Sequence, residues 1–515
     1  MSAAATAGPG GRAFRLLASL AVLTTILVGL VASPAAAASY TPATDVGSLY
    51  STTLMTGAQA YWKAGFTGKG VDVAVIDSGV APVPGLDGTD KLYHGPDVSF
   101  EAQVPELAHL DTYGHGTHMA GIIAGRGADA VTGRYPGDTS NFLGMAPDTR
   151  IVSLKAADAA GATDITQVIA AVDWVAEHKT DNGLNIRVIN LSFGTDSRQL
   201  PKIDPLAHAV ERAWKQGIVV VVSAGNAGFN MANGGPGLTN PARDPYVISV
   251  GASDPRGTTT LADDALAAFS SSGVPGAEGS KNPDLLAPGK SLASLRVPGS
   301  FLDETFGATA QLGEDNFRGS GTSQAAAVIS GAAALVLQQR PTIRPDQLKK
   351  LLTSTATALP AVKPEGQGKG VVNLAKALLT ATPSTKQSYD TATGAGTLEA
   401  ARGTPHLADE VELQGELDIT GTEVDTADLA SQRLTGRMWS GGAWSGRMWS
   451  GGEWAGRMWS GQLWSGRMWS SESWAGRMWS GRMWSSESWA GRMWSGVNWS
   501  GRMWSGDVWS SAGWN

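Results

Sequence analysis

The chain has 515 residues, enough for more than one domain, and a mildly acidic balance of 39 Lys and Arg against 46 Asp and Glu. This balance argues against nucleic acid as a partner, because neutralising phosphates requires a basic surface. The chain contains no cysteine, which excludes disulfides, thiolate chemistry and cysteine-based zinc sites.

Residues 1–38 have the order of a secretory signal peptide. Arg12 and Arg15 precede an apolar run over residues 16–32, and small residues follow up to Ala38, where we predict cleavage. The alternative is an uncleaved membrane anchor, for which the run is barely long enough. We therefore expect a secreted, extracellular protein. Only about 38 residues separate the predicted cleavage site from Asp77, a stretch too short to hold a further folded domain.

Residues 45–380 alternate short apolar runs with amphipathic stretches, which predicts an α/β domain with a mainly parallel sheet. The runs are β-branched and nearly continuous, as in strands buried on both faces. The predicted strands lie at residues 71–76, 151–154, 188–191 and 218–223, and the predicted helices at residues 165–175, 205–217, 324–339 and 346–352. Asp164 and Asp204 are placed to cap the first two helices.

The composition changes after this domain. Residues 381–435 are rich in Thr, Ala and Gly, with nine acids between Glu399 and Asp428, which predicts an acidic linker. Residues 436–515 form a repeat in which Gly-Arg-Met-Trp occurs eight times and tryptophan falls at every fifth position from Trp439 to Trp514. Glycine and serine supply turn signals in almost every unit, so we expect a β-rich or irregular repetitive segment.

Four motifs lie where predicted strands or helices meet loops. They are Val75-Ile-Asp-Ser-Gly79, Gly114-His-Gly-Thr-His118, Ser223-Ala-Gly-Asn226 and Gly319-Ser-Gly-Thr-Ser-Gln-Ala-Ala326. A serine hydroxyl needs an adjacent base to become a nucleophile, and a carboxylate orients that base. Ser323, His115 and Asp77 would supply these groups, and Asn226 could donate a hydrogen bond to an oxyanion. Taken alone, Asp77 or Asn226 is more typical of a turn residue, and His118 is interpreted as a helix residue.

The order of these four motifs resembles the subtilisin family of serine proteases (subtilases, peptidase family S8) over roughly residues 60–380. The resemblance implies a three-layer fold and an endopeptidase that hydrolyses peptide bonds through an acyl-enzyme. By that resemblance Asp77, His115 and Ser323 form the catalytic triad, and Asn226 with the Ser323 N–H forms the oxyanion hole. The substrates would be proteins or peptides.

The resemblance also implies a substrate-binding region. Two segments resemble the backbone edges that flank the substrate in this family, and they comprise Ser192, Phe193, Gly194, Ser223, Ala224 and Gly225. Glycine allows close approach there, and an extended substrate could pair as an added strand. The chemistry requires no cofactor. Structural calcium is common in the family, but no metal ligands can be assigned in this sequence, and Asp111 is left open between a structural partner and a calcium ligand.

The chain departs from the family pattern after the nucleophile. Gln324 stands where methionine is usual, and Ala327 stands where proline is usual, which predicts a mild effect on packing. Residues 290–317 make the stretch before Ser323 long, and we interpret them as a surface insertion near the site.

The repeat invites three interpretations. Flat aromatic and basic side chains suit binding to cell-wall glycan or to an anionic envelope surface, which would retain the protein at the cell. The repeat could instead pack on itself without a ligand, or self-associate through exposed aromatic edges. If the repeat were the working part, the α/β domain would be a non-catalytic scaffold in an envelope-binding or structural protein.

Overall fold

The computed structural model describes residues 40–104, 106–228, 237–276, 278–404, 406, 413–419, 423–434 and 501–503. The predicted signal peptide lies outside these residues, as does the repeat apart from residues 501–503. In the described part of the chain, no helix combines the length and apolar character that spanning a membrane requires.

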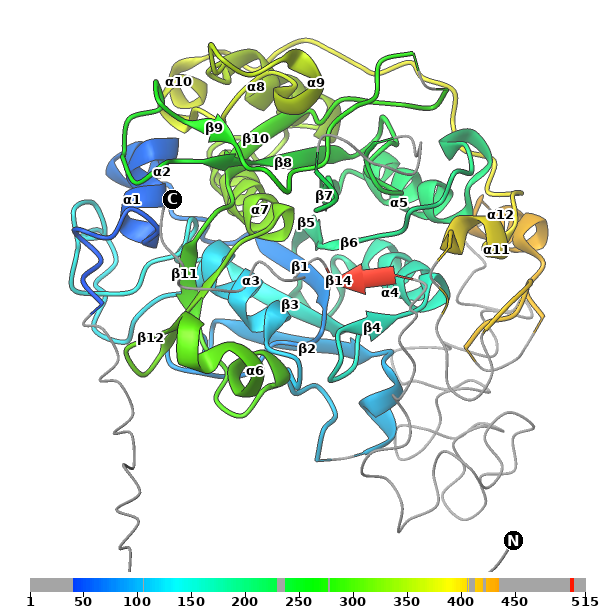
Figure 1. Cartoon of the computed structure of the whole chain (residues 1–515), viewed down its shortest axis with the longest axis horizontal. Helices are drawn as coiled ribbons and strands as arrows, with labels where there is room; N and C mark the ends of the chain where they lie inside the picture. The colour runs from blue at the N-terminus through cyan, green and yellow to red at the C-terminus, as the bar shows by residue number, and fades with distance from the viewer. Residues whose placement is uncertain are drawn as a thin grey trace, which may run out of the picture. The chain divides into compact units, whose positions relative to one another are not determined.

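A mainly parallel sheet forms the centre of the fold (Figure 1). Seven strands pair in parallel in the order β10-β8-β7-β5-β1-β3-β2, and β9 adds antiparallel to β8. Their bounds are β1 Asp72–Asp77, β2 Leu92–Asp97, β3 Arg150–Lys155, β5 Ile186–Leu191, β7 Val219–Ser223, β8 Ile248–Asp254, β9 Ala265–Leu266 and β10 Leu285–Pro288. The four predicted strands are confirmed, and Val219 to Val222 are fully buried, as expected of a strand covered on both faces.

Helices cover both faces of this sheet, which makes the predicted three layers. On one face α7 (Thr322–Gln339) packs against β5, β7 and β8, and α3 (His115–Ala124) packs against α7. On the other face α4 (Ile165–His178) contacts β1 and β5, and α5 (Pro205–Lys215) contacts β7. The predicted caps form: Asp164 makes a capping box with Gln167, and Asp204 accepts from two N–H groups of α5.

The strand order places a switch point between β1 and β5. From β1 the chain builds β2 and β3 on one side, and then crosses to build β5, β7, β8 and β10 on the other. Ligand sites in open parallel sheets lie beyond the carboxyl ends of the strands at such a point. Asp77 is the last residue of β1, and Asn226 follows β7 by three residues. The carboxyl ends of β1 and β7 are therefore the expected location of a functional site.

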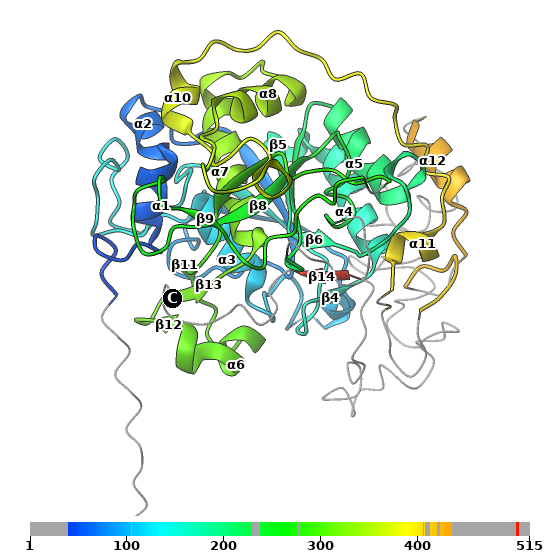
Figure 2. The same ribbon diagram turned by 45° about the horizontal axis from the view of Figure 1, so that its top comes forward.

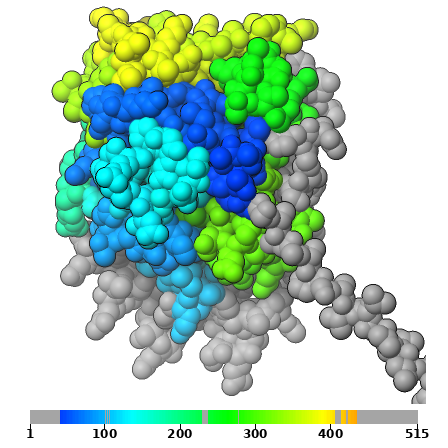
Figure 3. Space-filling view, turned by 90° about the vertical axis from the view of Figure 1, so that its left-hand side faces the viewer, coloured from blue at the N-terminus to red at the C-terminus, as the bar shows by residue number. Residues whose placement is uncertain are grey.

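Smaller elements surround the central layers. The N-terminal helices α1 (Leu49–Thr56) and α2 (Ala58–Lys63) occupy the face seen in Figure 3, in dark blue, beside the cyan residues that follow α3. The indole of Trp62 donates to the carbonyl of Met145, which joins these two segments at 3.0 Å. The remaining helices of this region are α8 Pro345–Thr355, α9 Pro364–Gln367 and α10 Leu374–Leu379.

The predicted insertion is folded. Residues 290–317 contribute β11 (Leu292–Leu295), α6 (Phe301–Ala310), β12 (Gln311–Leu312) and the start of β13 (Asn316–Gly319), which form an antiparallel sheet in the order β11-β13-β12. The ring of Phe301 stacks on Tyr113 with centroids 5.6 Å apart, and the Tyr113 ring lies 6.4 Å from that of His115. The insertion therefore packs on Tyr113, whose ring lies beside the predicted catalytic histidine.

The predicted linker differs from what the structure shows. Residues 381–435 include α11 (Leu398–Arg402) and α12 (Thr426–Leu434), which pack against α4 and α5. The buried side chain of Arg402 pairs with Asp164 at 2.8 Å, and that of Arg433 pairs with Asp173 at 2.8 Å. An acidic, low-complexity composition predicted a solvated linker, but two arginines whose partners lie more than 200 residues earlier hold this segment on the domain.

Candidate active site

Asp77 and His115 meet at the end of β1. The Nδ1 atom of His115 lies 2.7 Å from Oδ1 of Asp77, and both side chains are fully buried. β1 ends at the aspartate and α3 begins at the histidine, so each side chain is fixed by a regular element. A carboxylate on Nδ1 selects the tautomer whose Nε2 can accept a proton. The structure thus brings together two of the residues predicted from separate motifs.

A second carboxylate holds the start of α3 in place. Asp111 accepts from the backbone N–H groups of Gly114 and Thr117, each at 2.7 Å, and from the Ser78 hydroxyl at 2.8 Å. The Ser78 hydroxyl also accepts from the Gly116 N–H at 3.0 Å. Burial raises the pKa of Asp111. The sequence left Asp111 open, and the structure makes it a structural partner that positions His115 through the backbone on both sides of it.

Glycine is required beside the histidine. A Cβ atom at position 116 would lie 2.1 Å from the carbonyl oxygen of Gly79, far closer than atoms can approach. The close contact between α3 and the turn after β1 therefore depends on the glycine of the His-Gly-Thr motif. This packing is what allows Asp77 and His115 to reach each other.

Ser323 lies in the first turn of α7. The helix begins at Thr322, with Gly321 at its N-cap position, and the serine is buried. The N–H of Gly321 donates to the carbonyl of Gly289 at 2.8 Å, which ties the approach to the helix to the loop after β10. The first N–H groups of a helix have no partner within it, and they attract negative charge. The position therefore combines a hydroxyl with backbone donors.

Asn226 is fastened to the start of the same helix. Its side-chain oxygen accepts from the backbone N–H and the hydroxyl of Thr322, both at 2.9 Å. The N–H of Gly225 donates to the Thr322 hydroxyl at 3.1 Å. Because Oδ1 of Asn226 faces Thr322, Nδ2 of the same amide faces away from Thr322. The structure places Asn226 against Thr322, the residue before Ser323, although 96 positions separate Asn226 from Thr322 in sequence.

His118 belongs to the interior of the fold. The side chain is fully buried on α3, and its Nε2 lies 3.0 Å from the carbonyl oxygen of Phe317. Burial, with the nearby His115 as a smaller cause, lowers the pKa of His118 to about 3. A histidine that stays neutral and bonded to the backbone fits its interpretation as a helix residue.

The two predicted substrate segments differ in what their backbones do. Phe193 and Gly194 form β6, an edge that pairs with another strand, and Ser192 directly precedes it. Ala224 donates to Val250 and accepts from Thr239, so its backbone is already used within the domain. Gly225 likewise donates to Thr322, and its φ of 106° is a conformation that favours glycine. The backbone of Ala224 and Gly225 is therefore held within the domain, whereas the backbone of β6 pairs with a short additional strand.

The sequence missed a second edge. β4, which comprises Ala162–Thr163, lies just before α4 and forms part of a small sheet with β6. A two-residue strand carries no periodic pattern, and only the preceding Gly161, at φ 74°, signals a turn there. No sequence reasoning about residue types would have selected it.

Comparison with known proteins decides the family. The model described as the subtilase family, Peptidase_S8, matches residues 68–396, which is more than half of the chain and includes all four motifs. The chain belongs to the subtilase family. The expected fold is confirmed by this match and by the three-layer architecture described above.

The subtilase domain is similar to several known proteins. It is 37% identical over 310 residues to the serine protease AprX of Bacillus subtilis, which covers 60% of this chain and 66% of AprX. It is 32% identical over 314 residues to subtilisin DY of Bacillus licheniformis, covering 60% of this chain and 91% of that protein. The crystal structure of fervidolysin from Fervidobacterium pennivorans, a keratinolytic enzyme, superposes with a TM-score of 0.50 and 28% identity over 65% of this chain and 46% of fervidolysin. The chain thus spans just under two thirds of AprX and less than half of fervidolysin.

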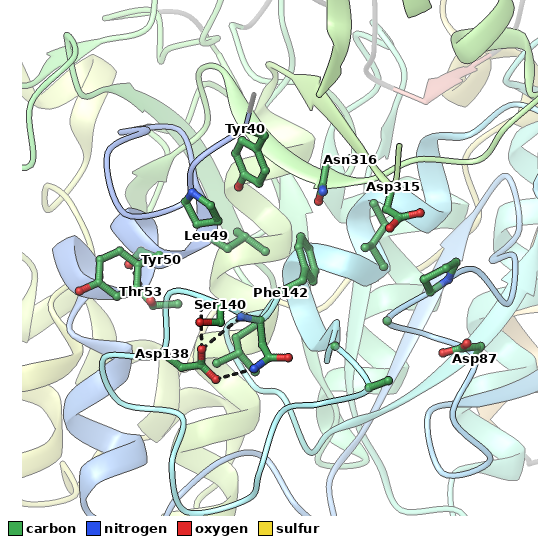
Figure 4. Close-up of a pocket in the computed structure, with 18 of the residues that line it drawn as sticks. Tyr40, Leu49, Tyr50, Thr53, Asp87, Asp138, Ser140, Phe142, Asp315 and Asn316 are labelled. Carbon is green, nitrogen blue, oxygen red and sulfur yellow. Dashed lines mark hydrogen bonds between the residues drawn. The ribbon is translucent and has the colours of Figure 1, made fainter. Parts of the chain in front are cut away.

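This subtilase also has a cavity of about 380 Å³ beside its N-terminal helices (Figure 4). Tyr40 and Leu49 line it from the N-terminal side, and Phe142 and Asn316 line it from the segment after α3 and from β13. Asp138 accepts from two backbone N–H groups of its own loop, at Ser140 and Asn141. None of the predicted site residues lines this cavity. Among the described residues, no group of three or more His, Asp or Glu side chains is arranged to hold a metal ion, and the calcium expectation stays a prediction.

Proposed function

We propose that this subtilase is a secreted serine endopeptidase that hydrolyses peptide bonds through an acyl-enzyme. The observation that carries the proposal is the buried contact of 2.7 Å between His115 and Asp77, at the same end of the sheet as the start of α7 with Ser323. An imidazole fixed by a buried carboxylate is a general base with a defined tautomer. The family to which the chain belongs supports the same activity.

Each residue would have one task. His115 takes the proton of the Ser323 hydroxyl through Nε2 while the serine oxygen attacks the scissile carbonyl carbon. His115 then gives that proton to the leaving amine, and the acyl-enzyme remains on Ser323. Water, deprotonated by the same histidine, attacks the ester carbonyl and releases the acid product. Asp77 holds the imidazole and stabilises its charged form.

The oxyanion would be stabilised by Asn226 and the Ser323 N–H. The two hydrogen bonds from Thr322 orient the Asn226 amide before any substrate arrives, so little reorganisation is needed during reaction. Losing one such donor costs about 3 kcal/mol of transition-state stabilisation in enzymes of this kind. Protein or peptide substrates would enter as extended strands along β6, with Ser192–Gly194 as the edge and Ser223–Gly225 as the wall.

Covalent labelling tests the function directly. Diisopropyl fluorophosphate should modify Ser323 of the purified mature protein, as located by mass spectrometry, and abolish hydrolysis of casein. Ser323→Ala should remove both labelling and hydrolysis, while the matched control Ser354→Ala, an exposed serine on α8, should retain both. Folded protein that neither reacts nor hydrolyses casein would contradict the proposal and favour a scaffold.

Export and retention form a separate part of the proposal. The order of charges, apolar residues and small residues in positions 1–38 supports secretion, and the Trp/Arg regularity of residues 436–515 supports retention at the cell envelope. Deleting residues 436–515 should shift the protein from the cell fraction to the medium. Unchanged partitioning between the two fractions would remove the retention hypothesis.

A further inference from the structure

A segment of the repeat lies in the substrate-binding region. β14, which comprises Gly501–Met503, pairs antiparallel with β4 on one side and with β6 on the other, as Figures 1 and 2 show in red. Arg502 stands opposite Ala162 in β4 and opposite Gly194 in β6, and Met503 stands opposite Phe193. Three residues of the C-terminal repeat thus form the central strand of a three-stranded sheet.

β14 has a paired strand on each of its two sides. Within the described strands, β4 and β6 are joined only through β14. Strands in a sheet lie about 4.8 Å apart, so two edges that share one central strand are roughly 10 Å from each other. Recognition by strand addition depends on main-chain hydrogen bonds, which any extended peptide can supply. The facing edges of β4 and β6, called the β4–β6 edge below, therefore form a binding site for an extended segment.

The position of β14 coincides with the predicted substrate edge. β6 belongs to the segment Ser192–Gly194, which the resemblance to subtilases implies is part of the substrate-binding region. Because β14 runs antiparallel to β6, its carboxyl end lies beside Phe193, the neighbour of Ser192. A segment of this chain thus occupies the edge that an extended peptide substrate would use.

The repeat supplies the same three residues many times. Gly-Arg-Met begins at eight positions from Gly436 to Gly501, and the unit that forms β14 is the last of them. Since pairing through the main chain is shared by all eight units, each can serve as a ligand of the same edge. Multiple copies raise the effective concentration of the ligand at the site without any new contact.

The repeat follows a helix that packs on the domain. Leu434 ends α12, which packs on α5, and Arg402 of α11 pairs with Asp164, the residue that directly follows β4. The 66 residues from 435 to 500 connect Leu434 with Gly501. Even at the 1.5 Å rise per residue of a helix, such a length would span about 100 Å. The length of the connection therefore does not limit access to the β4–β6 edge.

We propose that the Gly-Arg-Met units are tethered, substrate-like ligands of the β4–β6 edge, so that the repeat competes with peptide substrates for this edge of its own domain. This inference rests on the proposed endopeptidase function, since that function defines the substrate. The consequence is a protease whose activity toward added peptides is held down by its own C-terminal segment.

A binding measurement tests the proposal without turnover. The probe is the fluorescein-labelled hexapeptide Ser-Gly-Arg-Met-Trp-Ser, the sequence of residues 500–505, titrated with the full mature chain carrying Ser323→Ala. A second protein carries in addition Arg→Pro at all eight units, because proline lacks the N–H that a strand pair needs. The substituted positions are Arg437, Arg447, Arg457, Arg467, Arg477, Arg482, Arg492 and Arg502.

The proline protein should bind the probe more tightly. For an effective concentration on the order of 1 mM and a unit dissociation constant of about 0.1–1 mM, the tether weakens the apparent probe affinity by about two- to tenfold. A matched protein with Arg→Lys at the same eight positions retains the N–H groups and should behave like the parent. Hydrogen exchange at Phe193 and Gly194 should be faster in the proline protein than in either of the other two.

The outcomes separate this inference from the proposed function. If the three proteins bind the probe equally, or if none binds it, the tethered-ligand proposal is overturned. Labelling of Ser323 by diisopropyl fluorophosphate in the serine-containing parent shows in that case that the endopeptidase proposal survives alone. If the parent is neither labelled nor active, the failure lies in the proposed function, whatever the probe does.

Discussion

Gln324, next to the candidate nucleophile, provides a sharp test of the packing at the start of α7. Its side chain is fully buried, and neither its Oε1 nor its Nε2 has a hydrogen-bond partner among the described residues. A buried polar group without a partner costs about 1–3 kcal/mol of folding free energy. Replacing it with methionine, the residue usual in the family and close in size, removes this cost and adds an adaptable apolar side chain.

We therefore expect Gln324→Met to raise the free energy of unfolding by about 1–2 kcal/mol, since imperfect packing of the new side chain offsets part of the gain. With a guanidinium slope near 4 kcal/mol per molar, the unfolding midpoint should rise by roughly 0.3–0.5 M. The measurement is equilibrium unfolding in a Ser323→Ala background, which prevents self-digestion. Gln324→Glu, which buries a charge instead, is the matched control and should lower the midpoint. A methionine variant that is less stable than the parent would refute the reasoning.

Three further predictions concern buried charges. Burial, with Glu101 as a neighbouring charge, raises the pKa of Asp158 to about 8, whereas an unfolded aspartate ionises near 3.8. Between these two pH values the folded state binds more protons than the unfolded state. The contribution of Asp158 to the free energy of unfolding is therefore fully present below pH 3.8 and is lost as the pH rises to 8. In melting curves at pH 5 and pH 8, the parent should lose up to a few kcal/mol more unfolding free energy between the two pH values than Asp158→Asn does. Equal losses in the parent and the variant would contradict the prediction. In Asp111→Asn, the side-chain NH2 group faces one of the backbone N–H groups from which the carboxylate accepts a hydrogen bond. The variant should lose at least about 2 kcal/mol of unfolding free energy, as measured by equilibrium unfolding, and should have a lower kcat for casein hydrolysis. Wild-type kcat in a folded Asp111→Asn protein would show that the clamp does not position His115. Arg402→Met leaves the Asp164 carboxylate buried without its cation, and should cost about 3–5 kcal/mol. Asp164→Asn in the same protein should restore part of this loss in a double-mutant cycle, and purely additive losses would argue against the pair.

The central strands and helices were predictable from local patterns. The run Ile218–Val222 is apolar and β-branched without interruption, as expected of a strand buried on both faces, and Asp164 precedes a helical period at the position of an N-cap. By contrast, β2 is a strand at the edge of the sheet that contains Gly95 and Pro96, and a composition of this kind does not predict a strand. Its pairing comes from β3, not from its own composition.

The candidate site was predictable as a set of residues and not as an arrangement. Residue chemistry and motif order selected Asp77, His115 and Ser323, because an activated hydroxyl needs a base and a carboxylate. The same reasoning could not assign Asp111, whose role consists of hydrogen bonds to backbone groups that only the packed start of α3 presents to it.

By itself, the sequence determined the periodicities, the caps and the order of the chemical groups, since these depend on neighbours within a few positions along the chain. Only the tertiary structure decided that Arg402 is buried against Asp164, that the predicted linker packs on the domain, and that β4 and β6 receive a strand of the repeat. Such contacts join residues hundreds of positions apart, and they form when packing brings complementary charges or strand edges within hydrogen-bonding distance. Local composition carries no record of that distance.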